Sequence, residues 1–251
     1  MKKTLITAAC LTAALISAAR SERGPFLDTS RADHFIELGV HIGDGASTIR
    51  QNYVSAVPDV SDFVLTPGNR LTFGATAAIP LRNFLAIGTG IDLAINNYYW
   101  SMTVLSRQQG TLSSLYNRNH FYTVEIPVYM QWRFNVGTHV SWRCEAGAYI
   151  SFGAGGHSRF NEVRSSTNSL GQSQVTENKY KNNYFNEDDP VINTFDKTDM
   201  GLHLGTGILV HDRLTVSAAM HVGLTDLAKN MGVLEIHART LNVTFAVGYQ
   251  F

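Results

Sequence analysis

The sequence predicts an all-β fold: an eight-stranded antiparallel transmembrane up-and-down β-barrel with long extracellular loops and short periplasmic turns. Three observations lead to this fold class. Apolar and polar residues alternate in eight segments, the connections between these segments are alternately long and short, and charged residues make up only 16% of the 251 residues. The formal net charge of zero argues against binding of nucleic acid through a basic surface.

The chain begins with a segment typical of secretory signal peptides. Met1 is followed by two lysines, residues 4–16 are mainly apolar, and Ser17–Ala19 fits a small-residue cleavage site. Cleavage there would leave one of the two cysteines, Cys144, so no intrachain disulfide is expected. The predicted organisation is a signal peptide at 1–19, a periplasmic N-terminal tail at 20–33 and an outer-membrane barrel domain at 34–251.

Eight alternating segments follow the tail. Each has apolar residues at every second position and small or polar residues at the positions between them. Only Thr89 and Thr206 are polar among the apolar rows, and no member of these rows is charged. The predicted strands are residues 34–43, 71–79, 85–95, 120–134, 139–152, 200–210, 214–224 and 240–251.

The connections alternate strictly in length, as they do in outer-membrane barrels, where external loops are long and periplasmic turns are short. With an even number of strands, both termini would lie on the periplasmic side. The predicted long loops are residues 44–70, 97–118, 154–198 and 226–239. The predicted tight turns are residues 80–83, 135–138 and 211–213.

Alternation alone leaves open which row faces outward, because an exported soluble lipocalin-like ligand binder would bury its apolar row. Lysine favours the membrane barrel. After the signal segment it occurs only outside the predicted strands, at Lys179, Lys181, Lys197 and Lys229, whereas a solvated outer face is normally rich in lysine.

Aromatic residues on the apolar rows gather near the strand ends, as in the two aromatic girdles of a membrane barrel. The periplasmic girdle is predicted to consist of Trp132, Phe134, Trp142, Tyr249 and Phe251, and the outer girdle includes Tyr99, Tyr122 and Phe152. The last strand ends on Phe251 and is similar to the C-terminal signal that outer-membrane assembly machinery reads. The sequence therefore predicts the outer membrane of a Gram-negative bacterium, with outer-membrane lipid and the β-barrel assembly machinery as partners.

Three stretches carry a family resemblance. They are Glu125–Phe134, in which an acid and an aliphatic residue precede Pro127, then Gly223–Asp226, and Val247–Phe251 at the end of the chain. Over about residues 35–251 the sequence resembles the PorT-like outer-membrane β-barrel proteins typical of Bacteroidota. The resemblance implies a barrel of this type and suggests a link to protein secretion, with which the founding member is associated.

Six charged residues fall on the rows opposite the apolar ones: Glu37, Asp92, Glu125, Arg133, Arg143 and Glu145. Side chains just fill the interior of an eight-stranded barrel, so these charges are expected to pair in a stabilising polar cluster. A proton- or ligand-linked site is the alternative. A turn at 135–138 predicts that Gln131 lies opposite Arg143 and Tyr129 opposite Glu145.

The sequence offers few candidates for a cofactor or for catalysis. His41, His203 and His221 fall on inward rows and could ligate a metal, but their relative heights are not set by the sequence, so no metal site or cofactor is predicted. His157 and Ser158 are the nearest candidates for an outer-membrane enzyme acting on lipid A. Adjacent residues on a strand point to opposite faces, so no catalytic residue is predicted and the enzyme stays the alternative.

The loop predicted at 154–198 is the best candidate for binding a protein partner. It is rich in Asn, Ser and Gln, contains an acidic run at Glu187–Asp189, and has four aromatic residues: Tyr180, Tyr184, Phe185 and Phe195. A solvated surface loop is the simpler interpretation. The sequence as a whole predicts a structural, accessory or docking role at the cell surface.

Overall fold

The computed structural model describes residues 25–32, 35–54, 60–106, 111–167, 172–185, 195–227 and 235–251, so the predicted signal peptide lies outside the described residues. Within those ranges no helix is long and apolar enough to cross a membrane. The strands are β1 (Glu37–Val54), β2 (Val60–Arg82), β3 (Leu85–Ser106), β4 (Thr111–Asn135), β5 (Val140–Thr167), β6 (Ser173–Asn183), β7 (Thr198–Val210), β8 (Leu214–Gly223) and β9 (Glu235–Gln250).

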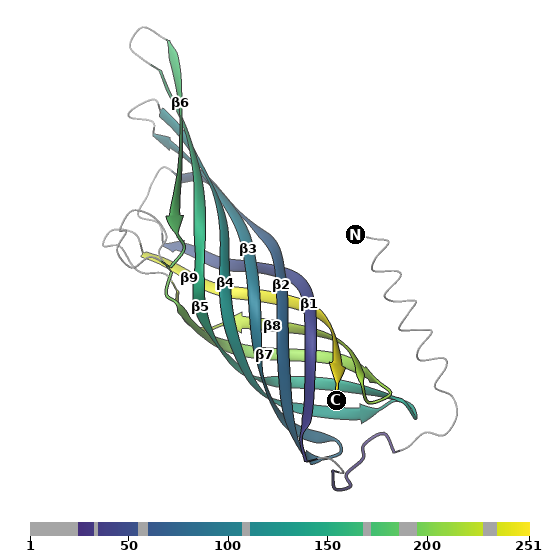
Figure 1. Cartoon of the computed structure of the whole chain (residues 1–251). Coiled ribbons are helices and arrows are strands. Elements are labelled where there is room, and N and C mark those ends of the chain that lie inside the picture. Colours follow the sequence, from purple (N-terminus) through teal and green to yellow (C-terminus); the bar gives the residue numbers. More distant parts are fainter. Residues whose placement is uncertain are drawn as a thin grey trace.

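Eight of these strands close into an antiparallel barrel (Figure 1). Strands β1 to β5 pair in chain order, β5 pairs with β7, β7 to β9 pair in chain order, and the ring closes where β1 pairs with β9. Strand β6 stands outside the ring, because it pairs only with the part of β5 from His157 to Thr167. The predicted eight-stranded barrel is therefore confirmed, with β6 as an additional ninth strand.

The apolar rows face outward and the polar rows face the barrel interior. Leu38, Ile91 and Val128 are about half exposed, whereas Glu125 on the opposite row is 1% exposed. A soluble lipocalin-like barrel requires the reverse arrangement, so that alternative is wrong. The two polar members of the outward rows are both hydrogen-bonded: Thr89 Oγ1 donates to the Pro127 carbonyl at 2.9 Å and Thr206 Oγ1 to the Arg143 carbonyl at 3.2 Å.

Most residues of the predicted loops belong to strands, so the predicted loop boundaries are wrong. Strand β4 has 25 residues and β5 has 28, whereas a tilted strand crosses a membrane in about 9–11. Beyond the apolar band the outward face of the sheet meets water, so the apolar alternation ends there although the hydrogen-bond ladder continues. The inward face next to the barrel stays buried, as at Trp100 and Phe160. We call residues 60–67, 98–106, 111–119, 157–167 and 173–183 the paddle; its β5 and β6 rise beyond the barrel in Figure 1.

A bulge separates the membrane-crossing part of β5 from its paddle part. Tyr122 pairs with Gly155 and Thr123 with Gly153, so one residue of β5 is skipped, and Gly155 has a φ of 153°, a conformation suited to glycine. The bulge reverses the alternation. Phe152 and His157 therefore both lie on the outward row although they are five residues apart, and Ser158 is buried.

Residues 25–32 lie against the two turns that join β2 to β3 and β4 to β5. The Asn135 amide donates to the Phe26 carbonyl at 2.9 Å, and the Phe26 ring stacks on Phe134 at 5.3 Å. Asp28 accepts hydrogen bonds from Ser30 and from the Asn83 side chain, and these bonds lower the pKa of Asp28. The described part of the predicted tail thus contacts the short-turn end of the barrel.

Candidate functional site

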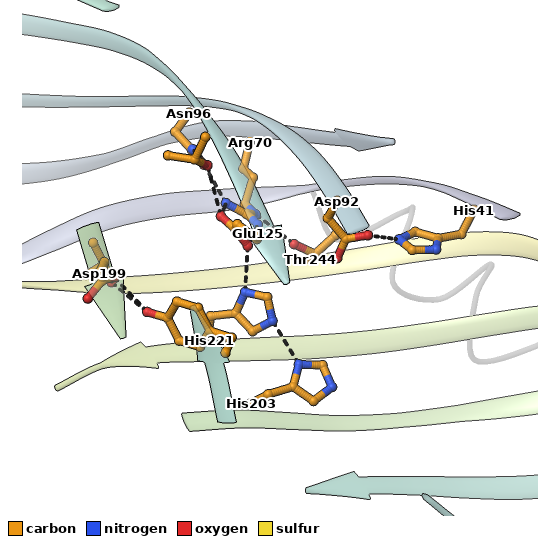
Figure 2. A network of polar contacts seen from close by, with 12 residues as sticks. His41, Arg70, Asp92, Asn96, Glu125, Asp199, His203, His221 and Thr244 are labelled. Carbon is orange, nitrogen blue, oxygen red and sulfur yellow. Dashed lines mark hydrogen bonds and ion pairs between the residues drawn. The ribbon is translucent and has the colours of Figure 1, made fainter. Parts of the chain in front are cut away.

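The centre of the barrel holds a buried ion pair between strands that are not neighbours. Arg70 of β2 donates two hydrogen bonds to Glu125 of β4, at 3.0 and 2.6 Å, and both side chains are 1% exposed. The same guanidinium donates to Asn96 Oδ1 at 2.6 Å and to Thr244 Oγ1 at 2.9 Å. Figure 2 shows this arrangement, in which four strands are connected through one arginine.

A pair of histidines extends this network toward β5 (Figure 2). His221 Nδ1 lies 2.8 Å from Glu125 Oε2, His203 Nδ1 lies 2.8 Å from His221 Nε2, and His203 Nε2 lies 3.4 Å from Glu145 Oε2. The two rings thus link the Glu125 carboxylate to the Glu145 carboxylate through three contacts, and each ring nitrogen faces one partner.

The third inward histidine belongs to a separate contact. His41 Nε2 lies 3.0 Å from Asp92 Oδ1, and a Cβ added at Gly74 would overlap both side chains unless they move. Within the described ranges, no three His, Cys, Asp or Glu side chains are grouped so that they could hold a metal ion. His41 is thus paired with a carboxylate, while His203 and His221 contact each other.

The remaining predicted charges meet at the periplasmic end of the interior. Arg133 donates to Glu37 at 2.6 Å, Arg143 lies 3.7 Å from the same carboxylate, and Arg143 also donates to Gln250. The predicted register is wrong, because Arg133 lies directly opposite Arg143 and Gln131 opposite Glu145. The hairpin loop has the predicted length but lies one residue later, at 136–139, where the amides of residues 136 and 137 both donate to the carbonyl of residue 140. A turn displaced by one residue moves each opposite partner by two residues.

All six predicted interior charges therefore face the barrel interior, together with three polar residues that the alternation alone does not single out: Arg70, Asp199 and Gln250. Arg70 and Asp199 lie one position before the predicted starts of their strands, and Gln250 was read only as part of the C-terminal strand. Asp199 accepts hydrogen bonds from Tyr149 at 2.8 Å and from Thr240 at 2.5 Å. Continuing the alternation by one step would have placed Arg70 and Asp199 on the inward rows.

The outer mouth of the barrel is closed by an aromatic cluster, which we call the mouth plug. Tyr184 is 1% exposed, stacks on Phe121 at 4.3 Å and on Phe195 at 5.1 Å, and its hydroxyl lies 3.1 Å from that of Tyr98. Leu227 packs in the same cluster. Two of the aromatic residues predicted to be available to a partner, Tyr184 and Phe195, are therefore buried, and the acidic run Glu187–Asp189 lies outside the described residues.

An internal cavity of about 110 Å³ lies between the periplasmic charges and the central ion pair. Its walls include His41, Asp92, Tyr129, Glu145 and His203. A polar cavity of this size has room for several water molecules, but a solute of larger size would meet the Arg70–Glu125 pair and then the mouth plug. The described interior is thus a packed polar core closed at its outer end.

The predicted girdle residues lie on the outward face. Phe134 and Trp142 are in contact at 5.5 Å, as are Tyr249 and Phe251 at 5.3 Å, and Trp132 lies beside Phe134 on the same row. Tyr99, Tyr122 and Phe152 are each about 40% exposed on the outward rows. These aromatic residues bracket the apolar outer surface at both ends.

The candidate enzyme residues do not form a dyad. Ser158 is buried in the interior, where its hydroxyl donates to Asn119 Oδ1 at 2.5 Å. His157 faces outward and its ring lies 5.3 Å from that of His120. The two residues thus point to opposite faces of the sheet, as expected from their adjacency.

Comparison with known proteins bears on both the fold and the location. No curated protein sequence matches the chain. Among solved structures it is similar to Ail of Yersinia pestis, crystallised with the heparin analogue sucrose octasulfate (13% identity, 87% of this chain and 100% of that chain covered, TM-score 0.36). It is also similar to OprG of Pseudomonas aeruginosa (9% identity, 91% and 99% covered, TM-score 0.36). The family model described as outer membrane protein beta-barrel domain matches residues 20–229, and the chain belongs to that family of outer-membrane barrels.

Proposed function

We propose that this protein is a closed, non-catalytic scaffold in the outer membrane that presents the paddle as a docking surface at the cell surface. One observation carries the proposal: the barrel is filled and plugged, while β2–β5 continue well beyond the length that a membrane requires and β6 extends the sheet further. A filled barrel suits an anchor better than a conduit. Exposed loops and strand extensions are where binding residues concentrate.

A photo-crosslinker at Val175 tests the docking role in intact cells. Val175 is 67% exposed on β6, so a bound partner should give a discrete crosslinked product there. The matched control places the crosslinker at Leu38, which is 49% exposed on the lipid-facing row, and should give no protein product. Absence of a product at Val175 and at other exposed paddle positions would rule out docking through the paddle.

Removal of residues 164–176 with a two-residue turn in their place tests whether the paddle is separable from the barrel. Val163 and Glu177 pair directly, so the shortened hairpin keeps its register. The shortened protein should still show the change in gel mobility on heating that marks a folded barrel. The partners crosslinked through exposed paddle positions in the unaltered protein should no longer be captured. The link to secretion suggested by PorT-like proteins stays a prediction; the same deletion should lower the amount of exported protein in the medium if it holds.

Two further measurements address the alternatives. The proposal expects no single-channel steps in planar bilayers, because the interior is filled. It also expects an unchanged lipid A mass spectrum after deletion of the gene. A changed spectrum, restored by the intact gene, would favour the enzyme acting on lipid A.

A further inference from the structure

The outward face of the paddle carries a row of cations across three adjacent strands. Arg118 of β4 lies directly opposite Arg159 of β5, which in turn lies directly opposite Lys181 of β6. On the other side of Arg118 the ladder places Tyr99 of β3, and the guanidinium lies over this ring at 5.9 Å. We call Arg118, Arg159 and Lys181 the cation row.

No described acidic residue lies within ion-pairing distance of the cation row. The nearest cation on the same face, Lys179, pairs with Glu177 at 2.9 Å, and Glu177 lies further toward the tip of the paddle. Cations directly opposite one another in a sheet destabilise it. The positive charges also act on a neighbour: burial, together with the charges of Lys181, His120 and Arg159, lowers the pKa of His157. Three cations in one row, with no acidic partner among the described residues, form a candidate site for an anionic ligand.

The position of the row limits what that anion can be. On β4 the outward row is apolar or aromatic up to Tyr122, the outer girdle residue, and Arg118 lies four residues further out. At about 3.4 Å per residue and a tilt of about 40°, Arg118 stands about 10 Å above Tyr122. Long Arg and Lys side chains reach down from this height into the headgroup layer.

The cation row lies on the outer face of the sheet, on the side that faces lipid further down the barrel. Arg118 and Arg159 continue the rows that face lipid further down, on β4 and β5, and do not face the barrel mouth. An open groove of about 880 Å³ runs along this face, and Tyr99, Tyr116, Lys179 and the cation row contribute to its walls. A ligand in this groove can keep its acyl chains against the apolar band while its headgroup meets the cations.

We propose that the cation row and Tyr99 bind the phosphate groups of a phosphorylated glycolipid in the outer leaflet. Guanidinium groups bind phosphate through paired hydrogen bonds, and Lys181 adds a third positive charge at the edge of the groove. The Tyr99 ring lies beside Arg118 and offers an apolar face to a sugar. This inference depends on the orientation of the barrel in the outer membrane and not on a protein partner at the paddle.

The test uses the full chain in phosphatidylcholine nanodiscs that contain purified diphosphoryl lipid A, with bound lipid counted by native mass spectrometry. The test variant is the triple substitution Arg118→Gln, Arg159→Gln and Lys181→Gln. The matched control is Arg164→Gln, because Arg164 lies on the opposite face of the same paddle and pairs with Glu162 at 3.0 Å. A second arm replaces the lipid A with its dephosphorylated form.

The expected result is a loss of about fivefold in affinity for each cation removed and of about 100-fold for the triple variant. Arg164→Gln should bind like the unaltered protein, and dephosphorylated lipid should bind as weakly as it does to the triple variant. Binding should also raise the pKa of His157, measured by NMR. Since the cations repel one another, the triple variant should unfold at a temperature no lower than that of the unaltered protein when lipid A is absent.

Three results would overturn the proposal. One is equal binding of phosphorylated and dephosphorylated lipid A. Another is equal binding by the triple variant and the unaltered protein. The third is displacement of lipid A by inorganic phosphate or by heparin at the same anion concentration, which would instead assign the row to soluble anions or to a sulfated glycan.

Discussion

Arg70 and Glu125 join β2 to β4 across the intervening strand β3, through two hydrogen bonds in the middle of the barrel. Neither residue forms a described ion pair with an oppositely charged Asp, Glu, Lys or Arg on its own strand. Removing water from two charges is costly unless their geometry is good and their remaining hydrogen bonds are made. Here Asn96, Thr244 and His221 complete those bonds. The pair and these three neighbours therefore connect five strands of the barrel, β2, β3, β4, β8 and β9, at one height.

Glu125→Gln should lower the free energy of unfolding by about 3 kcal/mol, because it leaves the buried charge of Arg70 without a counterion. Urea unfolding in lipid vesicles measures the change. The matched variant Glu145→Gln should cost less, since the Glu145 carboxylate is 20% exposed and its contact with His203 is 3.4 Å long. Equal losses for the two variants would contradict the central place given to the Arg70–Glu125 pair.

Gly74→Ala should destabilise the barrel by about 1–3 kcal/mol, because the added methyl would overlap Asp92 Oδ1 and the His41 ring. The expected change is a lower midpoint temperature for the shift in electrophoretic mobility that accompanies unfolding of the barrel. Gly90→Ala is the milder control, since its new Cβ would meet its nearest neighbour, the Ala75 carbonyl oxygen, at 3.0 Å. If Gly74→Ala were as stable as the unaltered protein, the His41–Asp92 contact would not constrain this part of the interior.

Tyr184→Ala should open the mouth plug. The loss of a buried aromatic ring that touches Tyr98, Phe121 and Phe195 should cost about 3 kcal/mol. It should also let a small neutral quencher enter the outer part of the barrel interior, and the quenching of Trp100 fluorescence measures this access. Val175→Ala on the same hairpin is the control, because Val175 is exposed and should change neither quantity.

Lowering the pH should release the N-terminal tail from the turn at Asn83. The pKa of Asp28 is lowered by its hydrogen bonds, so the contribution of docking to stability is present above the ordinary carboxyl pKa of about 4 and is lost as the pH falls through the lowered value. Hydrogen exchange at the Asn83 amide, which donates to the Ser30 carbonyl, reports the docking. Asp28→Asn should show fast exchange already at neutral pH; slow exchange in that variant would assign docking to Phe26 alone.

The alternation of residues is sufficient to predict the barrel and its outward rows. A strand that separates lipid from a polar interior must alternate, and each residue reports its own surroundings without reference to distant parts of the chain. The apolar–polar alternation disappears in the paddle, because outward residues such as Arg118 and Lys181 are exposed to water, as loop residues are. For that reason the sequence predicts one long loop at 154–198, where the structure has the outer half of β5 and all of β6.

The residue pattern alone predicts a barrel with an apolar outer surface and identifies six of the charges inside it. Which of these charges pair depends on the three-dimensional arrangement of the strands. The bulge at Gly155, the position of the turn before Val140 and the closure of β1 on β9 set the register between strands. Contacts such as Arg70–Glu125, and the buried position of Tyr184, depend on that register, because a partner across the barrel is fixed by strand tilt and closure and not by any single strand.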